Sequence, residues 1–320
     1  MNRSSIIPLC LAIVWMYSGP TAAAQAPCAY PLSITVPKGF PTPVYDRLEI
    51  VARDGVRLVV HRWTPPNIAA DKPVVLFVHG LGSHGEPFAS IAAGFTSRQM
   101  TLLVPDLRGH GRSEGKRGKL ADWSILRADL GEVIGLVNRR HPEARVFLAG
   151  ESMGGLIAAD YAVHGERRLA GLMLLAPAFK VHEAQIKLSG VEEFIKGHVI
   201  LNTDKKIKPS TREPGFIEAR MKDPFVLTEI DSSYLVSIRL RQRDWPSSAL
   251  LLKLPLFIGV AGHDEIVSPK AAKAVFDLAA TPKEAKTWRH WDDARHTVCW
   301  DPLTPLIVED MTAWVRETLK

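Results

Sequence analysis

Five short, predominantly apolar segments constrain the fold of this chain more than any other feature. Each has the length of a β-strand, and helical spacing or turn residues separate one from the next. Strands that are apolar at nearly every position are buried on both faces, as in a parallel sheet covered by helices on both sides. The pattern therefore predicts an α/β fold with a mostly parallel sheet flanked by helices. The five segments are residues 73–78, 101–105, 144–149, 169–176 and 254–260.

A hairpin precedes these strands. Residues 47–52 and 56–63 alternate apolar and polar side chains around Asp54-Gly55, a dipeptide typical of tight turns. We therefore expect two antiparallel strands at the start of the sheet. The helical segments that should cover the sheet are residues 87–98, 123–140 with Asp122 as N-cap, 156–163 and 269–280.

One long stretch, residues 178–253, interrupts the alternation of strands and helices. It is too long for a simple crossover, and it follows the end of a strand where open α/β sheets bind ligands. We expect a helical lid there, although its apolar stripes could instead pack on the main core. Helical spacing is present at residues 235–240 and at Ile186, Val191, Phe194, Ile195 and Val199.

The first 24 residues have the features of a secretory signal peptide. Arg3 precedes an apolar run over residues 6–17, and small residues follow, with a cleavage site after Ala24. An uncleaved anchor is the alternative, but the run is shorter than the roughly 20 residues that span a bilayer. The chain is therefore predicted to be exported, to the periplasm or the medium, as one domain over residues 25–320.

Export changes the interpretation of the three cysteines. Cys10 leaves with the signal peptide, so Cys28 and Cys299 remain in an oxidising compartment. They form a disulfide or stay as two buried thiols, and the sequence leaves both open. The formal net charge of +6 permits transient contact with an anionic membrane surface. Scattered charges that serve solubility are the alternative, and no nucleic-acid-binding motif is present.

Residues 150–154, with the sequence GESMG, lie between a strand and a helix. A GxSxG turn in that place holds its serine exposed above the sheet, ready to act as a nucleophile. A serine hydroxyl needs a base within hydrogen-bond reach, and the base needs an acid to orient it. We therefore expect Ser152 to be the nucleophile, followed along the chain by an acid and then a histidine.

Asp264 is the acid that the pattern favours, because it directly follows a buried strand. His296 is the expected base, since it lies in the loop before the C-terminal helix. His290 falls within an apparent strand, residues 286–291, and is expected to be structural. Asp292 and Asp293 are the alternatives for the acid.

The oxyanion of an acyl-transfer intermediate needs fixed donors. We expect the backbone N–H groups of Met153, next to the nucleophile, and Leu81 to supply them. His79 should brace the loop that carries Leu81. A metal role for His79 would need further ligands at suitable spacing, and none is evident, so neither a metal nor a cofactor is expected.

Four motifs together resemble the monoacylglycerol lipase and lysophospholipase branch of the α/β-hydrolases, which is related to serine aminopeptidases. Residues 79–84 (HGLGSH) are similar to the oxyanion loop of that branch, and residues 106–118 (DLRGHGRSEGKRG) to its long GHGxSxGxRG signature. The nucleophile turn at 150–155 and the segments of Asp264 and His296 complete the set. Glu151 departs from the histidine often found before the nucleophile.

The resemblance implies a serine hydrolase that cleaves carboxylic esters of single-chain lipids, monoacylglycerols or lysophospholipids, through an acyl-enzyme and without a cofactor. An esterase for small or aromatic esters, a peptidase for short substrates and an acyltransferase are the alternatives. A noncatalytic lipid-binding homologue belongs to a different class. Four basic side chains could meet a phosphate headgroup, or could be solvated or brace a loop: Arg112, Lys116, Arg117 and Lys119.

Overall fold

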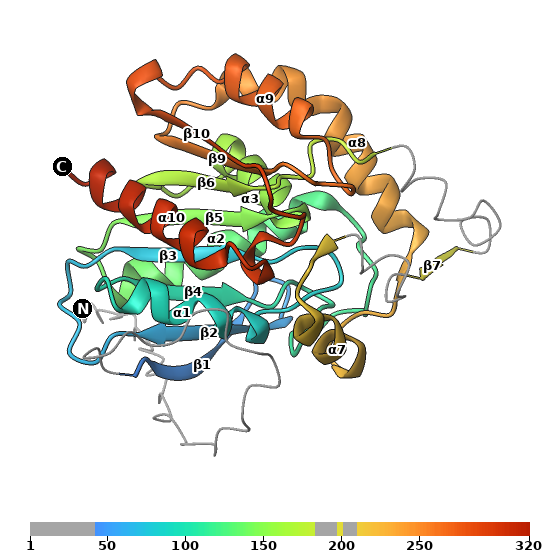
Figure 1. The fold of residues 1–320 in the computed structure, drawn as a ribbon. Helices are drawn as coiled ribbons and strands as arrows, with labels where there is room; N and C mark the ends of the chain where they lie inside the picture. The colour runs from blue at the N-terminus through green and yellow to red at the C-terminus, as the bar shows by residue number, and fades with distance from the viewer. Residues whose placement is uncertain (1–41, 183–196, 201–209) are drawn as a thin grey trace, which may run out of the picture.

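An eight-stranded sheet forms the centre of the molecule (Figure 1). The computed structural model describes residues 42–182, 197–200 and 210–320. The strands lie in the order β1-β2-β4-β3-β5-β6-β9-β10, antiparallel for β1, β2 and β4 and parallel from β4 to β10. The predicted mostly parallel sheet is therefore confirmed. The strands are β1 (Val44–Val51), β2 (Arg57–Thr64), β3 (Val74–Val78), β4 (Thr101–Pro105), β5 (Val146–Glu151), β6 (Gly171–Leu175), β9 (Leu256–Ala261) and β10 (Lys286–Trp291).

The hairpin at Asp54-Gly55 is confirmed, with strand ends that differ from the prediction by up to three residues. Gly55 has a φ of +86°, which a glycine adopts without strain. The amide of Ala52 donates to the carbonyl oxygen of Val56 across the turn at 2.8 Å. This hairpin adds an antiparallel edge to the parallel sheet.

The strands divide their side chains between two hydrophobic clusters, one on each face. On one face, alternate residues such as Leu76 and Leu148 pack with α2 (Trp123–Arg140), α3 (Met153–His164) and α9 (Pro269–Leu278). On the other face, Phe77 and Phe147 pack with α1 (Ala89–Thr96) and α10 (Thr304–Thr318). Helices α1 and α10 cover the same face of the sheet (Figure 1). Both faces are buried, which explains why the central strands lack polar alternation.

The predicted helices are present, with small differences at their ends. Asp122 accepts a hydrogen bond from the amide of Ser124 and caps α2 as expected. The predicted helix at 87–98 is shorter, because residues Glu86–Phe88 form a 3-10 turn (η1) before α1. None of the helices in the described part of the chain has the length and apolar character that crossing a bilayer requires.

The described part of the segment 178–253 contains helices α7 (Pro214–Lys222) and α8 (Ser232–Ser248) and the 3-10 turn η3 (Ala249–Leu251). A short antiparallel pair, β7 (His198–Ile200) and β8 (Glu229–Asp231), accompanies them. The apolar residues predicted at 235–240 are helical, within α8.

Val199 lies in β7, so the helical prediction for this residue was wrong: its backbone pairs with Ile230 of β8. Ile186, Val191, Phe194 and Ile195 lie outside the described residues.

Helix α8 shows why the apolar pattern of the segment 178–253 does not distinguish a lid helix from a helix that packs on the core. Tyr234, Ile238 and Trp245 on one face of α8 are at most 5% exposed and belong to the main cluster. The other described parts of the segment approach the loops that follow β3 and β4. The amide of Leu227 donates to the carbonyl oxygen of Gly82 at 2.9 Å, and that of Asp231 to Gly118 at 2.9 Å.

Two helical glycines provide a test of how closely α3 approaches β3. A Cβ on Gly154 would lie 2.1 Å from the carbonyl oxygen of Val78, whereas one on Gly131 in α2 meets only Tyr161 at 3.8 Å. We expect Gly154→Ala to lower the free energy of unfolding by about 2 kcal/mol or more. Gly131→Ala should raise it by up to about 1 kcal/mol, because alanine favours a helix. Urea unfolding of both variants measures the difference, and equal stabilities would contradict the close approach.

Candidate active site

The turn between β5 and α3 holds Ser152 in a backbone conformation that few side chains adopt. Its φ is 58° and its ψ is −122°, where a residue with a Cβ is strained. A Cβ on Gly150 would lie 2.3 Å from the carbonyl oxygen of Gly154. Because neither Gly150 nor Gly154 has room for a side chain, the helix begins close against the strands. This packing is the physical reason for the GxSxG pattern.

The structure brings the three predicted catalytic side chains together. Ser152 follows β5, Asp264 lies in the loop after β9 and His296 in the loop after β10. The Oγ of Ser152 lies 2.8 Å from Nε2 of His296, and Nδ1 of His296 lies 2.9 Å from Oδ2 of Asp264. With the proton on Nδ1, the imidazole donates to Asp264 and its Nε2 accepts from the serine hydroxyl. This is the geometry of a nucleophile, base and orienting acid.

Asp264 is itself fixed by the start of the next loop. Its Oδ1 accepts the backbone N–H groups of Ile266 and Val267, each at 2.9 Å. Asp264 and His296 are 8% and 6% exposed, so little solvent competes for their hydrogen bond. The carboxylate is therefore held in one orientation toward the imidazole.

The alternative residues lie elsewhere. The side chain of His290 is 47% exposed on β10 and pairs with Asp292 at 2.8 Å. Asp292 and Asp293 are both exposed. His296 and Asp264, by contrast, form the hydrogen-bonded series to Ser152, so the geometry favours them.

The charges around His296 favour its protonated form. Burial alone would lower the pKa of His296, but the charge and hydrogen bond of Asp264 and the charge of Glu151 outweigh burial and raise the pKa. A raised pKa makes the imidazole a stronger base toward the serine proton. The site therefore stabilises the imidazolium that a proton transfer from Ser152 creates.

The expected oxyanion loop lies beside the nucleophile. A Cβ built on Gly80 would lie 3.3 Å from Cβ of Ser152 and 3.8 Å from its Oγ, so this loop passes close to the serine side chain. Leu81 follows directly, and Met153 opens helix α3 with its N–H at the positive end of the helix dipole. Leu81 therefore follows a residue that contacts Ser152 and Met153 follows Ser152 directly, and their role as oxyanion donors stays a prediction.

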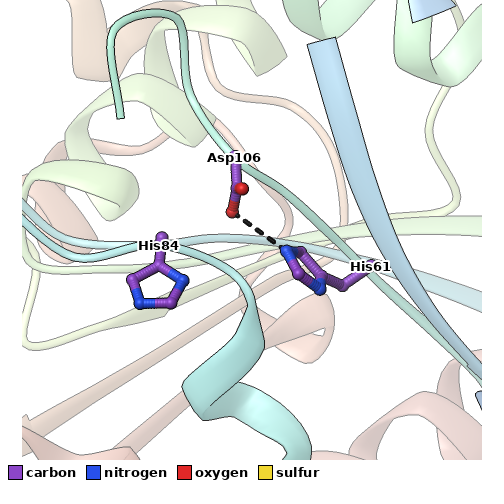
Figure 2. Close-up of side chains that lie close together, drawn as sticks. All are labelled: His61, His84 and Asp106. Atoms are coloured by element: carbon purple, nitrogen blue, oxygen red, sulfur yellow. Dashed lines mark ion pairs between the residues drawn. The ribbon is translucent and has the colours of Figure 1, made fainter. Parts of the chain in front are cut away.

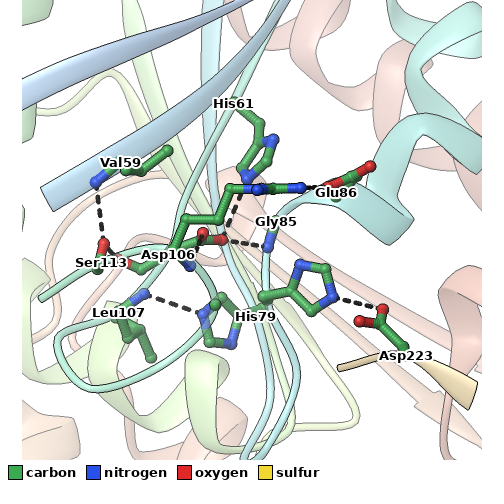
Figure 3. Close-up of polar contacts among 12 residues, drawn as sticks. Val59, His61, His79, Gly85, Glu86, Asp106, Leu107, Ser113 and Asp223 are labelled. Atoms are coloured by element: carbon green, nitrogen blue, oxygen red, sulfur yellow. Dashed lines mark hydrogen bonds and ion pairs between the residues drawn. The ribbon is translucent and has the colours of Figure 1, made fainter. Parts of the chain in front are cut away.

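His79 braces this loop, as predicted. Its Nδ1 donates to the carbonyl oxygen of Gly80 at 2.9 Å, and its Nε2 accepts from the amide of Leu107 at 3.0 Å (Figure 3). Burial lowers the pKa of His79 to about 3, so the ring is neutral and has one donor and one acceptor nitrogen. The two bonds join the loop after β3 to the loop after β4.

A buried carboxylate, Asp106, ties the same loops together more firmly. Its Oδ1 accepts the amide of Gly85 at 2.6 Å, and its Oδ2 accepts the amide of Arg112 at 2.8 Å (Figure 3). Ser113 donates to the carbonyl oxygen of Asp106 and accepts the amide of Val59. Burial would raise the pKa of Asp106, but the neighbouring His61 holds it well below its usual range. Asp106 therefore stays ionised, and its two oxygens hold the loops after β3 and β4 together.

Among the residues that the structure describes, one group has the spacing to share a metal ion. The candidate ligand atoms of His61, His84 and Asp106 lie within 4.8 Å of one another (Figure 2). No local sequence pattern marks this group, because its members lie on a strand and on two separate loops. Both Asp106 oxygens accept backbone amides, and Nε2 of His84 lies 2.7 Å from Asp223 (Figure 3). These contacts make the group a brace, which links the oxyanion loop to the end of α7.

The basic residues of the second motif mostly brace loops. The guanidinium of Arg112 lies 3.3 Å from Glu86 and 3.9 Å from the ring centre of Phe225. Arg117 donates to the carbonyl oxygens of Gly111 and Phe225, each at 3.0 Å. Lys119 pairs with Asp231 at 3.5 Å, and Lys116 is exposed. The loop-bracing alternative therefore fits Arg112, Arg117 and Lys119 better than a headgroup site.

The cysteine prediction is addressed only in part. Cys299 is 1% exposed, whereas Cys28 lies outside the described residues, so their pairing stays a prediction. Burial and the charge of Glu151 raise the pKa of the Cys299 thiol. As a thiol, Cys299 is therefore protonated at neutral pH.

Known proteins match most of this chain in sequence. The sequence profile of the serine aminopeptidase S33 family matches residues 69–302. Monoacylglycerol lipase of Mycolicibacterium smegmatis is 26% identical, over 82% of this chain and 93% of its own length. Caffeoylshikimate esterase of Arabidopsis thaliana is 24% identical, over 78% of this chain and 79% of its own length.

A solved structure shows the same fold. A soluble variant of monoglyceride lipase from Saccharomyces cerevisiae, in complex with a substrate analogue, superimposes with a TM-score of 0.74. The match covers 90% of this chain and 98% of that one, at 17% sequence identity. The chain therefore belongs to the serine aminopeptidase S33 family, with the α/β-hydrolase fold and a resemblance to its monoacylglycerol lipase branch.

Proposed function

We propose that this protein is an exported serine hydrolase that cleaves the carboxylic ester of a single-chain lipid, a monoacylglycerol or a lysophospholipid, through an acyl-enzyme. The observation that carries the chemistry is the hydrogen-bonded series from Ser152 through His296 to Asp264. Such a series turns a weak hydroxyl nucleophile into a reactive one.

In the first half of the reaction, Oγ of Ser152 attacks the ester carbonyl carbon and its proton moves to Nε2 of His296. Asp264 holds the ring and stabilises the imidazolium. The N–H groups of Leu81 and Met153 would donate to the oxyanion of the tetrahedral intermediate. His296 then gives its proton to the leaving alcohol as the ester bond breaks. Water repeats these steps on the acyl-enzyme and releases the fatty acid.

The substrate class rests on the relatives. The bacterial monoacylglycerol lipase matches this chain over 93% of the length of that enzyme. The yeast monoglyceride lipase has the same fold as this chain. An esterase for aromatic esters is the second candidate, because a relative of comparable identity carries the name caffeoylshikimate esterase. The described helices α7 and α8 belong to the segment that we propose as the lid, residues 178–253.

Export is part of the proposal, since residues 1–24 have the pattern of a signal peptide. An extracytoplasmic enzyme would meet its lipid at a membrane surface. The mildly basic chain suits transient contact with anionic lipids, and no other partner is proposed.

A substrate series tests the ester class. We expect kcat/KM for monoacylglycerols to rise from acetyl to decanoyl chains by about tenfold or more, because each buried methylene adds about 0.8 kcal/mol of binding. Hydrolysis is followed by fatty-acid release, with lysophospholipid and caffeoyl esters in parallel. A preference for acetyl or caffeoyl esters would support the esterase alternative. The wild-type protein should also react with a fluorophosphonate, and Ser152→Ala should not.

Paired histidine variants test the base. His296→Ala should lose about a thousandfold or more of kcat, because its Nε2, 2.8 Å from Oγ of Ser152, is the atom placed to accept the serine proton. His290→Ala, which alters an exposed surface pair, should keep most of the activity. Hydrolysis of p-nitrophenyl butyrate measures both, and loss of activity in His290→Ala alone would show that the base was wrongly chosen.

Intact mass spectrometry of protein isolated from an oxidising compartment tests export and the disulfide together. We expect a chain that begins at Gln25, and a gain of two hydrogens on reduction if Cys28 and Cys299 are paired. An unprocessed N-terminus would contradict signal cleavage, and two alkylated cysteines without reduction would contradict the disulfide.

A further inference from the structure

Glu151, the residue before the nucleophile, is a buried acid that the reaction steps above do not use. It ends strand β5, and it is 4% exposed. Its Oε1 accepts the backbone N–H of Cys299 at 3.1 Å. Cys299 lies in the 3-10 turn η5 (Val298–Trp300), three residues after His296. One side chain thus joins the nucleophile turn to the loop that carries the base.

This connection is one of several that fix the base loop. The amide of Val298 donates to the carbonyl oxygen of His296 at 3.0 Å. Thr304 donates to the carbonyl oxygen of Val298, and the carbonyl oxygen of Cys299 accepts from Ser90. The bonds of Thr304 and Ser90 join the loop to α10 and α1, whereas Glu151 contacts the loop from the side of Ser152. It is therefore placed to set the separation of Ser152 and His296.

The titratable groups that face Glu151 in the described part of the chain belong to the same loop. They are the imidazole of His296 and the thiol of Cys299, and Asp264 contacts the imidazole at Nδ1. Burial raises the pKa of Glu151 to about 7, although His296 and the amides of Cys299 and Val298 act in the opposite direction. Its protonation is therefore coupled to that of His296.

We propose that Glu151 is a positioning residue for His296. The buried carboxylate of Glu151 fixes the base loop against the nucleophile turn and adds a negative charge beside the imidazole. The proposal rests on the serine-hydrolase function proposed above. When Ser152 transfers its proton, the imidazolium forms near two carboxylates, Asp264 and Glu151. Ionised Glu151 stabilises that state, and protonated Glu151 does not.

Glu151→Gln is the decisive variant, because glutamine keeps an oxygen that accepts the Cys299 amide and removes the charge. Without that charge the pKa of His296 falls, so the acid limb of the kcat/KM profile should move to lower pH by about half a unit or more. Above pH 8, kcat should fall by about threefold to tenfold. Glu151→Asp should restore part of the pH dependence. Glu166→Gln, the same change at a surface acid, should leave the profile unchanged.

A second measurement does not depend on activity. The pKa of folded Glu151, about 7, lies above its ordinary value of 4.5, so folding favours the protonated form. That contribution to stability is present below pH 4.5 and is lost as the pH rises through 7. The Tm of Glu151→Gln relative to wild type should therefore be higher at pH 8 than at pH 5. Glu166→Gln should show no such change.

The outcomes separate this proposal from the proposed function. If wild type does not react with a fluorophosphonate, the serine-hydrolase function fails and Glu151 has no base to position. If wild type reacts, but Glu151→Gln has a wild-type pH profile, the positioning role of its charge is overturned. A uniform loss of activity at every pH, with an unshifted acid limb, would also overturn it, because that result indicates a structural role only.

Discussion

The left-handed backbone of Ser152 is the constraint on which the rest of the structure depends. A single residue with a φ of 58° turns the chain from a strand into a helix, and such a residue is strained unless its neighbours hold it. The amide of Ser152 donates to Leu175 of β6 at 3.0 Å, and its carbonyl oxygen accepts the amide of Ala178 at 2.9 Å. The backbone of Ser152 is thus fixed by the next strand and by the segment that follows that strand, and the absence of side chains at Gly150 and Gly154 lets α3 pack closely.

The parallel sheet then makes the chemistry possible. Strands that run in one direction end at one edge, so loops far apart in sequence meet there. His296 lies 144 residues from Ser152 and 32 from Asp264, yet both contacts are shorter than 3 Å. The loops after β3 and β4 reach the same edge, where Asp106 and His79 join them. The site is therefore a product of strand direction and of a few buried polar groups.

Sequence patterns predicted the parts of the site that have a local signature. Ser152 lies in a glycine-bounded turn, and Asp264 and His296 each follow a strand. Their order along the chain was therefore sufficient to select them as candidates. The group of His61, His84 and Asp106 has no such signature, because the strand β2 and two loops bring it together. Val199 was wrongly expected in a helix, since one apolar residue fits either period and only its pairing with Ile230 decides. Strand ends shifted by a few residues because capping and pairing, which depend on neighbours, set them.

Glu151 is intermediate between the residues that a local sequence pattern identifies and those that only the structure identifies. In the sequence, Glu151 departs from the histidine common at this position, but the sequence does not predict which groups its side chain contacts. The structure directs the carboxylate to the amide of Cys299, in a site where burial opposes its charge. A buried acid that lowers stability above neutral pH is a local conflict between folding and charge, and such conflicts are characteristic of functional sites. The carboxylate of Glu151, whose charge burial opposes, lies beside the imidazole of His296, which becomes positive in the reaction. The residue that lowers stability is therefore placed to favour the reaction.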